Sequence, residues 1–379
     1  MKAYGESPIQ QVKKRFRKNK TAMAGWYFIL LSFFIAVFAY LIIPDSTPMA
    51  NRSNLSISNQ PPGFKVQLLK IPKQYVEKTG LFKRIFFGQK DAFDYIPFRS
   101  VHIQDNILYY REFTGDEDSL SVPENKISLS LISKNGIKDE KNLMGENIIE
   151  RTYFFGTDRY GRDMLSRLLA GTRVTLSVGL VAVIISLLTG LFLGSIAGFF
   201  RGKVDSVIVW LINVVWSIPT LLLVITITLV LGKGFEQVFI AVGLTMWVDV
   251  ARIVRGQLFS VRELEYVSAG KSMGFRNIRI ITLHMLPNII GPVLVVAASN
   301  FSTAILLEAG LSFLGIGAQP PMPSWGGMIK ENYALIIIPG SAYLAILPGL
   351  AIMFLTMAFT FVANGMRDAI DSKSQVSIV

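Results

Sequence analysis

The sequence has no cysteine and only two histidines, His102 and His284. The absence of cysteine excludes disulfides, thiol catalysis and metal sites with cysteine ligands. With so few histidines, a histidine-based metal site is not expected either. Charged residues make up only 17% of the 379 positions, below the share found in soluble domains. The composition therefore argues against a soluble enzyme with a metal or thiol site.

Long apolar runs are abundant: 51% of the residues are hydrophobic, and the mean hydropathy is +0.45. Several runs exceed the ~18 residues that a helix needs to cross a bilayer. The first run is too long and too aromatic for a cleaved signal peptide, and it lacks a small-residue cleavage site. We therefore predict an all-α polytopic membrane protein with six transmembrane helices at 24–43, about 174–199, 206–231, 237–254, 287–313 and 340–363.

Basic residues indicate which side of the membrane each connection occupies. The tail before the first run carries a cluster of lysines and arginines against one acid, Glu6, and the connection 249–286 carries Arg252, Arg255, Arg262, Lys271, Arg276 and Arg279. The short loops on the opposite side carry few basic residues. The positive-inside rule therefore predicts that both termini and 249–286 face the cytoplasm. The net charge of +12 is then a topology signal, and we do not expect nucleic-acid binding.

The spans and the polar segments divide the chain into regions. We expect a cytoplasmic basic tail at 1–23, the first span at 24–43, an extracytoplasmic insert at 44–153, a core of five spans at 154–366 with a cytoplasmic loop at about 255–286, and a cytoplasmic tail at 367–379.

The insert shows β-like alternation in V-Q-L-L-K-I, S-V-H-I-Q-D-N-I-L-Y-Y and K-I-S-L-S-L-I, with a turn signal at Asn135-Gly136. We predict a small β-rich fold that begins with a disordered stretch at 51–63. A poorly ordered loop is the alternative.

Two features of the spans concern helix packing. Gly190, Gly194 and Gly198 recur every four residues, so one helix face lacks side chains and another helix can approach it closely. The approaching helix could belong to this chain or to another subunit. Pro219 lies inside the third span, where its missing N–H and its ring favour a kink.

The cytoplasmic segment 265–288 is larger than a simple connector needs to be. It is polar and basic, contains glycines in a helical pattern, and ends at Leu286-Pro287. Gly270-Lys271-Ser272 resembles the end of a phosphate-binding loop, but Glu265 stands where that loop needs a glycine, and no strand precedes it. We therefore interpret the segment as a docking element that receives energy from a partner.

Other polar residues in or near the spans have structural explanations. Glu308 is an acid in or near the fifth span, and we favour a structural hydrogen bond over a functional role. For His284 we favour packing or capping. Asp249, Arg252 and Arg255 share one helix face, so we expect a surface ion pair among them.

The outer loop before the last span is rich in proline, with Gln319, Pro320 and Pro321 followed by Trp325. Prolines fix φ, so the loop is stiff. Trp325 could anchor the loop at the membrane interface. The loop could also seat an external partner.

Three motifs resemble those of one family, the permease subunits of binding-protein-dependent ABC importers, and in particular the "C" subunit of dipeptide, oligopeptide and nickel systems. The stretch G-T-D-R-Y-G-R-D-M-L-S-R-L-L-A-G-T-R-V-T-L-S-V-G at 156–179 is similar to the family's approach to its second helix. Segment 265–288 resembles the cytoplasmic "EAA" loop, and L-S-F-L-G-I-G-A-Q-P-P-M-P-S-W-G-G-M at 311–328 is similar to the subfamily signature. The resemblance covers about 13–43 and 154–372.

The EAA loop departs from its pattern in two places. Ser268-Ala269-Gly270 stands where the family has Glu-Ala-Ala, and His284 replaces the usual isoleucine, whereas Gly274, Leu286 and Pro287 match. The ATPase-coupling residues that the resemblance implies are Arg262, Glu265, Ser268, Ala269, Gly270, Gly274, Phe275, Leu286 and Pro287. In this interpretation the small Ala269, Gly270 and Gly274 lie on or near one face of a short helix. Its polar rim is formed by Arg262, Glu265, Arg276 and Arg279.

The resemblance implies the fold of a type I ABC importer permease and the transport of dipeptides or oligopeptides across the cytoplasmic (inner) membrane. It implies a homologous second permease subunit, two cytoplasmic ATPase subunits and an extracytoplasmic solute-binding protein as partners. It also implies that the chain is not an enzyme and binds no cofactor, because the partner subunits use the ATP.

Two alternatives stay open. The same machine could carry nickel, an opine or a peptide antibiotic. Otherwise, the chain could be a membrane-anchored receptor or scaffold that acts through 44–150.

Overall fold

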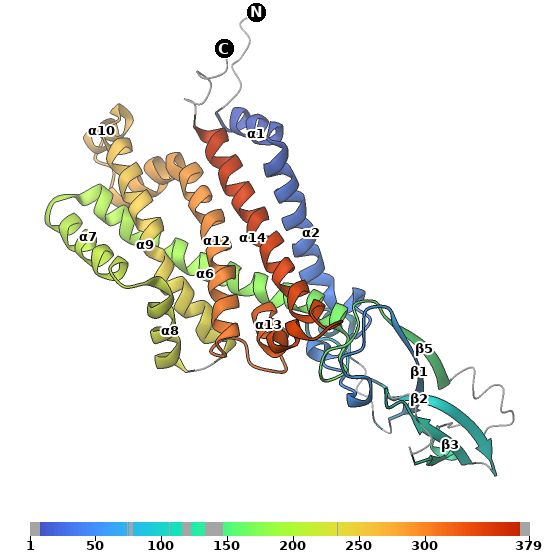
Figure 1. The fold of residues 1–379 in the computed structure, drawn as a ribbon. Coiled ribbons are helices and arrows are strands. Elements are labelled where there is room, and N and C mark those ends of the chain that lie inside the picture. The colour runs from blue at the N-terminus through green and yellow to red at the C-terminus, as the bar shows by residue number, and fades with distance from the viewer. Residues whose placement is uncertain are drawn as a thin grey trace, which may run out of the picture.

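The computed structural model describes residues 8–73, 75, 79–105, 107–115, 123–132, 147–232 and 234–371. The Asn135-Gly136 turn lies outside the described residues. The described elements form a helical bundle with a β-sheet unit at one end (Figure 1).

Five helical segments are long and apolar enough to cross a membrane: α2 (Lys20–Ile42), α6 (Met164–Phe200), α9 (Phe235–Arg262), the run Asn277–Phe313 and α14 (Tyr343–Ile370). A sixth candidate span is a broken pair, α7 (Gly202–Trp216) and α8 (Thr220–Leu231), bent by 91°. Pro219 directly precedes α8, at the break where a kink is predicted. The polytopic helical fold predicted from the sequence is confirmed.

The run Asn277–Phe313 is made of four successive pieces: α11 (Asn277–Arg279), the π-helical η4 (Ile280–Met285), the 3₁₀ segment η5 (Leu286–Ile289) and α12 (Ile290–Phe313). The other short helices in the described residues are α1 (Pro8–Lys18), η1 (Pro48–Ala50), η2 (Leu55–Ile57), α3 (Leu81–Phe87), α4 (Leu129–Ile132), α10 (Glu265–Ser272), α13 (Trp325–Asn332) and η6 (Tyr333–Ile337).

Helices α6 and α9 pack along a seam of glycines. An added Cβ at Gly194 would lie 2.6 Å from the carbonyl oxygen of Ala251, and one at Gly198 would lie 2.8 Å from Cβ of Leu258. Gly190 likewise faces Val250. All three glycines of the predicted packing face therefore serve contact with α9 of the same chain rather than contact with another subunit.

Beside this seam, α9 also contacts α7. Arg255 of α9 forms an ion pair with Asp205, with 2.6 Å between Nη2 and Oδ2, and the guanidinium of Arg252 lies 3.5 Å from the centre of the Trp216 ring. The ion pair expected among Asp249, Arg252 and Arg255 is therefore replaced by a pair between two helices.

The insert contains a five-stranded antiparallel sheet in the order β4-β3-β2-β1-β5. Its strands are β1 (Phe64–Pro72), β2 (Phe93–Gln104), β3 (Ile107–Glu112), β4 (Asn125–Ser128) and β5 (Ile148–Tyr153). Both faces of β1 are covered, because Val66 and Leu68 pack in one hydrophobic cluster and Leu69 in another. The predicted β-rich insert is confirmed, although the second half of K-I-S-L-S-L-I forms α4 instead of a strand.

The predicted disorder at 51–63 is wrong. This stretch contains η2, and its backbone pairs with the segment that leads into α6. The amide of Asn54 donates to the carbonyl of Tyr160 at 2.9 Å, and that of Asn59 donates to Asp158 at 3.0 Å. A polar composition predicted exposure to water, but the backbone groups are satisfied by a segment about a hundred residues away.

Candidate functional site

The predicted docking element lies beyond the end of α9, and α10 is at the same end of the bundle as α1 (Figure 1). Two arginines fix the end of α9. Nη1 of Arg262 donates to the carbonyl of Phe199 at 2.6 Å, and Nη2 of Arg201 donates to Glu263 Oε1 at 2.6 Å. Arg262 is therefore turned inward as a support for the loop instead of forming its outer rim.

Helix α10 has an inner and an outer face. Val267 is only 1% exposed and packs with Ile280 and Met285. On the opposite side, four residues with i, i+3, i+4 and i+7 spacing are exposed. We call this outer side the docking face: Glu265, Ser268, Ala269 and Ser272.

Gly270 does not belong to the docking face. It is buried, and an added Cβ would lie 3.5 Å from Cδ2 of Phe275. The expected grouping of Ala269 with Gly270 and Gly274 is corrected here, because residues 269 and 270 point about 100° apart around the helix axis.

Gly274 ends α10 through its backbone conformation. Its φ is +76°, a value that residues with a side chain rarely adopt, and nothing lies within 4 Å of an added Cβ. Its amide donates to Lys271 O at 3.0 Å, and the amide of Phe275 donates to Gly270 O at 3.1 Å. These bonds form the Schellman motif, which closes a helix and reverses the chain.

The returning chain is clamped onto α10. The rings of Phe275 and His284 stack at 5.9 Å with an 8° angle, and the Arg279 guanidinium lies 4.3 Å from the centre of the Phe275 ring. Nδ2 of Asn288 donates to the Tyr266 hydroxyl at 2.9 Å. We call this group of five residues the loop clamp. His284 packs within it, whereas Tyr266 and Asn288 were missed by sequence reasoning because no local pattern links two residues so far apart.

The loop clamp also stabilises an irregular helix start. Pro287 cannot donate an amide hydrogen bond, and the chain before it is π-helical at Ile280–Met285. Nδ2 of Asn288 donates to the His284 carbonyl at 2.6 Å. Leu286 is half-buried and Pro287 is exposed. Both belong to η5, which continues without a break into α12, so this end of the predicted coupling loop is joined to a span.

Apolar side chains flank the docking face. Met273 is 64% and Ile278 is 69% exposed, and Leu264 is 47% exposed. Apolar residues exposed beside a polar helix are typical of a protein interface. The sequence carries this signal as isolated apolar residues inside a basic loop, and the prediction did not use it.

At the opposite end of the bundle, Trp325 is buried and ties the outer loop to α6. It is 4% exposed, and its Nε1 donates to the carbonyl of Leu168 at 2.9 Å. Gly171 leaves room for the indole, since an added Cβ would lie 2.7 Å from Trp325 Cδ1. The expectation that Trp325 acts as an exposed anchor or partner contact is therefore wrong.

Three residues of the outer loop do remain accessible. Gln319, Pro320 and Pro321 are exposed. Nε2 of the Gln319 side chain donates to Gly315 O at 3.1 Å and to Gly317 O at 2.9 Å. The loop is thus folded onto itself as a fixed protrusion.

Glu308 forms a buried polar network beneath this loop. Its side chain is 1% exposed and accepts hydrogen bonds from Ser312 Oγ at 2.8 Å and Thr175 Oγ1 at 3.4 Å. Ser312 Oγ in turn accepts the amide of Ala318 at 3.2 Å. These bonds agree with the structural role favoured for Glu308.

A buried ionic cluster holds the outer end of α6. Arg162 donates to Asp158 Oδ2 at 2.7 Å and to Glu331 Oε2 at 2.7 Å, while Nε of Arg167 lies 3.6 Å from Asp158. Asp163 caps α6 by accepting the amide of Ser166 at 3.0 Å. Burial raises the pKa of the Asp163 carboxyl, although its hydrogen bonds to Ser166 act in the opposite direction.

Metal chemistry has no evident site in the described ranges, where no group of three or more acidic or histidine side chains is placed to hold an ion. The Lys271 ammonium, part of the rejected phosphate-loop pattern, lies 5.4 Å from the Phe199 ring centre.

Comparison with known proteins adds family information. Residues 190–376 match the family described as the inner-membrane component of binding-protein-dependent transport systems, and residues 7–62 match the N-terminal transmembrane domain of oligopeptide transport permease C.

Named relatives agree with these matches. The dipeptide permease protein DppC of Alkalihalophilus pseudofirmus is 38% identical over 58% of this chain and 72% of its own length. The glutathione permease protein GsiD of Pectobacterium atrosepticum is 36% identical over 58% and 73%. DppC of Lactococcus lactis is 29% identical over 97% and 91%, so that match extends into the insert.

Proposed function

The chain belongs to the family of inner-membrane permease components of binding-protein-dependent transport systems, and on this premise we propose that it imports dipeptides or oligopeptides. It would form half of a translocation path together with a homologous second permease subunit. Two relatives are named for dipeptides and one for glutathione, which is itself a short peptide. A short peptide is thus the solute chemistry common to these names.

ATP would be bound and hydrolysed by two cytoplasmic ATPase subunits, and this chain would bind no cofactor. The observation that supports docking is the docking face of α10, which is exposed, flanked by Met273 and Ile278, and held by the loop clamp. The clamp matters because a force on α10 can only be passed on if α10 does not move independently of the spans.

The path of that force follows from the contacts. Val267 of α10 shares a hydrophobic cluster with Met285 and Ile289, which lead directly into α12, and with Val261 of α9. Closure of docked ATPases would therefore tilt α9 and α12 together. Rigid-body rocking of one part of a helical bundle against another is a known way for membrane transporters to alternate access to a central path.

The orientation belongs to the same proposal. The basic N-terminal helix α1 and the docking face lie at one end of the bundle, which the positive-inside rule assigns to the cytoplasm. The sheet of the insert and the exposed Gln319–Pro321 protrusion would then face the solute-binding protein outside.

The solute is tested by uptake. We expect cells that express the complete transporter to accumulate a labelled dipeptide in an ATP-dependent manner, and unlabelled di- and tripeptides to compete in excess. Nickel should not compete. Competition by nickel but not by peptides would overturn the assignment of the solute, while leaving the permease family intact.

A further inference from the structure

A small cavity lies at the outer end of the bundle, between the start of α6 and the outer loop. Its volume is about 250 Å³, and it is lined by Arg159 and Arg167 on one side, by Gln319 of the loop, and by Lys330 of α13. Helix α13 lies at the end of the bundle opposite α10 (Figure 1). The cavity is therefore beside the exposed Gln319–Pro321 protrusion and far from the docking face.

Arg167 is the buried cation of this cavity. Its side chain is 2% exposed, and its Nη1 has no hydrogen-bond partner among the described residues. Nε lies 3.6 Å from Asp158 Oδ2 and Nη2 lies 3.8 Å from Glu331 Oε2, and both distances exceed the usual length of a hydrogen bond. Both acids instead accept from Arg162, at 2.7 Å each. A guanidinium carries five N–H donors, so Arg167 retains donors for a further acceptor.

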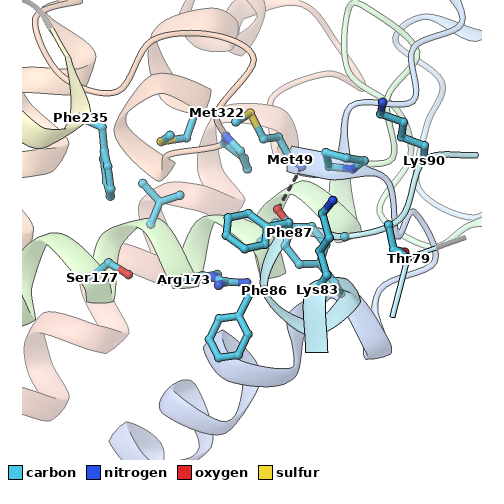
Figure 2. Close-up of a pocket in the computed structure, with 16 residues that line it drawn as sticks. Met49, Thr79, Lys83, Phe86, Phe87, Lys90, Arg173, Ser177, Phe235 and Met322 are labelled. Carbon is cyan, nitrogen blue, oxygen red and sulfur yellow. Dashed lines mark hydrogen bonds between the residues drawn. The ribbon is translucent and has the colours of Figure 1, made fainter. Parts of the chain in front are cut away.

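A second arginine of α6 is bound differently. Figure 2 shows Arg173 at another cavity, of about 620 Å³, between the insert and the spans. Its Nη1 donates to the carbonyl of Ile85 at 3.1 Å, and its guanidinium lies 5.4 Å from the centre of the Phe86 ring. An arginine at the outer part of α6 can therefore find an acceptor within the chain, and Nη1 of Arg167 does not find one among the described residues.

The opening of the small cavity adds positive charge. The formal charges of the two buried arginines and the two acids described above cancel each other. Lys330 comes in addition, because it is exposed and forms no ion pair with a described carboxylate. Its ammonium lies against the cavity wall, since an added Cβ at Gly315 would collide with Nζ. Arg159 is exposed at the cavity as well, so the opening has an excess of positive charge.

Size and lining restrict what can enter. Pockets that enclose a small-molecule ligand typically measure roughly 300–1,000 Å³, so this cavity is small for an oligopeptide. Ala318, Pro320 and Met322 give it an apolar wall beside its cations. A planar carboxylate matches the fork of a guanidinium, and a short hydrocarbon stem matches the apolar wall. The glutamate or aspartate side chain of a docked protein has both parts.

We propose that this cavity receives an acidic side chain of the extracytoplasmic solute-binding protein, whose carboxylate pairs with Arg167 and Lys330. The inference rests on the proposed function, because that function supplies the partner and places this end of the bundle outside. It adds the chemistry of the contact and the residues that make it. The incoming carboxylate would give the Arg167 guanidinium its missing acceptor, so docking would form a new charge pair at the outer end of α6.

The test uses the complete transporter in nanodiscs with its own purified solute-binding protein, and measures their dissociation constant without ATP. Lys330→Glu puts a negative charge where the carboxylate enters, and we expect it to weaken binding at least about tenfold. Arg167→Lys keeps the charge but loses the planar fork, and we expect a loss of similar size. The matched control is Lys203→Glu, which reverses the charge of an exposed lysine at the opposite end of the bundle and should bind as wild type does.

Equal affinity of the Lys330→Glu and Lys203→Glu transporters for the binding protein would overturn the inference, and so would wild-type affinity of Arg167→Lys. Thermal unfolding checks that Arg167→Lys folds, and if it does not, the two lysine variants decide alone. Unchanged binding with a raised KM for dipeptide uptake in Lys330→Glu would also overturn the inference, since the cavity would then receive the carboxylate of the transported peptide.

The wild-type transporter judges the proposed function separately. If it binds the protein and takes up dipeptides while every variant binds alike, the inference alone fails. A wild type that neither binds the protein nor takes up peptides would overturn both.

Discussion

At the scale of single residues, neighbouring small side chains in the coupling loop have different tasks. Ala269 is exposed on the docking face, Gly270 packs inward on Phe275, and Gly274 supplies a positive φ. The sequence shows three small residues and cannot distinguish these tasks, since which one faces outward depends on how α10 is rotated against Ile280 and Met285.

Gly274 gives a prediction that separates conformation from size. Asparagine adopts positive φ far more readily than alanine or valine does, and there is room for a side chain. We expect Gly274→Asn to transport nearly as wild type, and Gly274→Val to lose most uptake at equal membrane content. Gly274→Ala should be intermediate, since alanine costs about 1–2 kcal/mol there. Equal loss in the asparagine and valine variants would mean that the surface at residue 274 must stay bare.

Glu308 gives a second prediction at this scale. Glu308→Gln keeps an oxygen that can accept from Ser312, whereas Glu308→Leu leaves Ser312 and Thr175 without their partner. We expect the leucine variant to be destabilised by about 1–3 kcal/mol and the glutamine variant by clearly less. Thermal unfolding of the purified protein measures this. A glutamine variant that is stable but inactive would instead show that the carboxylate takes part in transport.

At the scale of elements, the α6–α9 seam explains how two long helices approach closely in a membrane. Lipid tails are as apolar as the side chains of a span, so the hydrophobic effect does not drive two helices together inside a membrane. Close van der Waals packing at small residues stabilises the helix pair instead. Gly243 of α9 adds to the seam, because an added Cβ would lie 2.7 Å from Cβ of Ile185.

The seam predicts a selective effect of bulk. An added Cβ at Gly194 would already collide with Ala251 and Val254, whereas an added Cβ at Gly256 on α9 has no atom within 4 Å. The variants Gly194→Leu and Gly256→Leu compare the two positions. We expect the first variant to lose about 1–3 kcal/mol or to fail to accumulate, and the second to behave as wild type. Membrane abundance and thermal unfolding of the isolated chain provide the measurement. Equal stability of the two variants would contradict the packing described here.

Among the elements, those with a local sequence pattern could be predicted, and contacts between distant segments could not. The spans follow from apolar runs, which are read within a short window, and the long helices of the structure lie at those runs. Arg162 and Glu331 are 169 positions apart, and Asn54 pairs with Tyr160 through backbone atoms. Such pairings leave no periodic signal, which is why the ionic cluster was missed and why 51–63 was wrongly expected to be disordered.

At the scale of the whole molecule, the insert is bonded to the spans on two sides. The Tyr343 hydroxyl at the start of α14 donates to Gln60 O at 2.6 Å, and the amide of Asp45 donates to Ser166 Oγ in α6 at 2.9 Å. The insert therefore moves with the outer ends of α6 and α14. Of these two helices, α6 is also held at its opposite end, because Arg262 at the end of α9 donates to the carbonyl of Phe199.

We propose above that α10 receives the motion of a docked ATPase through its exposed face, and the variant Ala269→Trp tests this docking. Residue 269 is exposed and helical, so the change adds bulk to the docking face without disturbing the inner cluster. Ser206→Trp, at an exposed position near the start of α7, is the matched control.

The measurement is ATP-driven uptake of a labelled dipeptide by the reconstituted transporter, together with the amount of ATPase that co-purifies. We expect Ala269→Trp to lose at least about tenfold in both quantities, because one steric clash in an interface costs about 1.4 kcal/mol or more, while Ser206→Trp keeps both. Full uptake with bound ATPase in the Ala269→Trp transporter would contradict it.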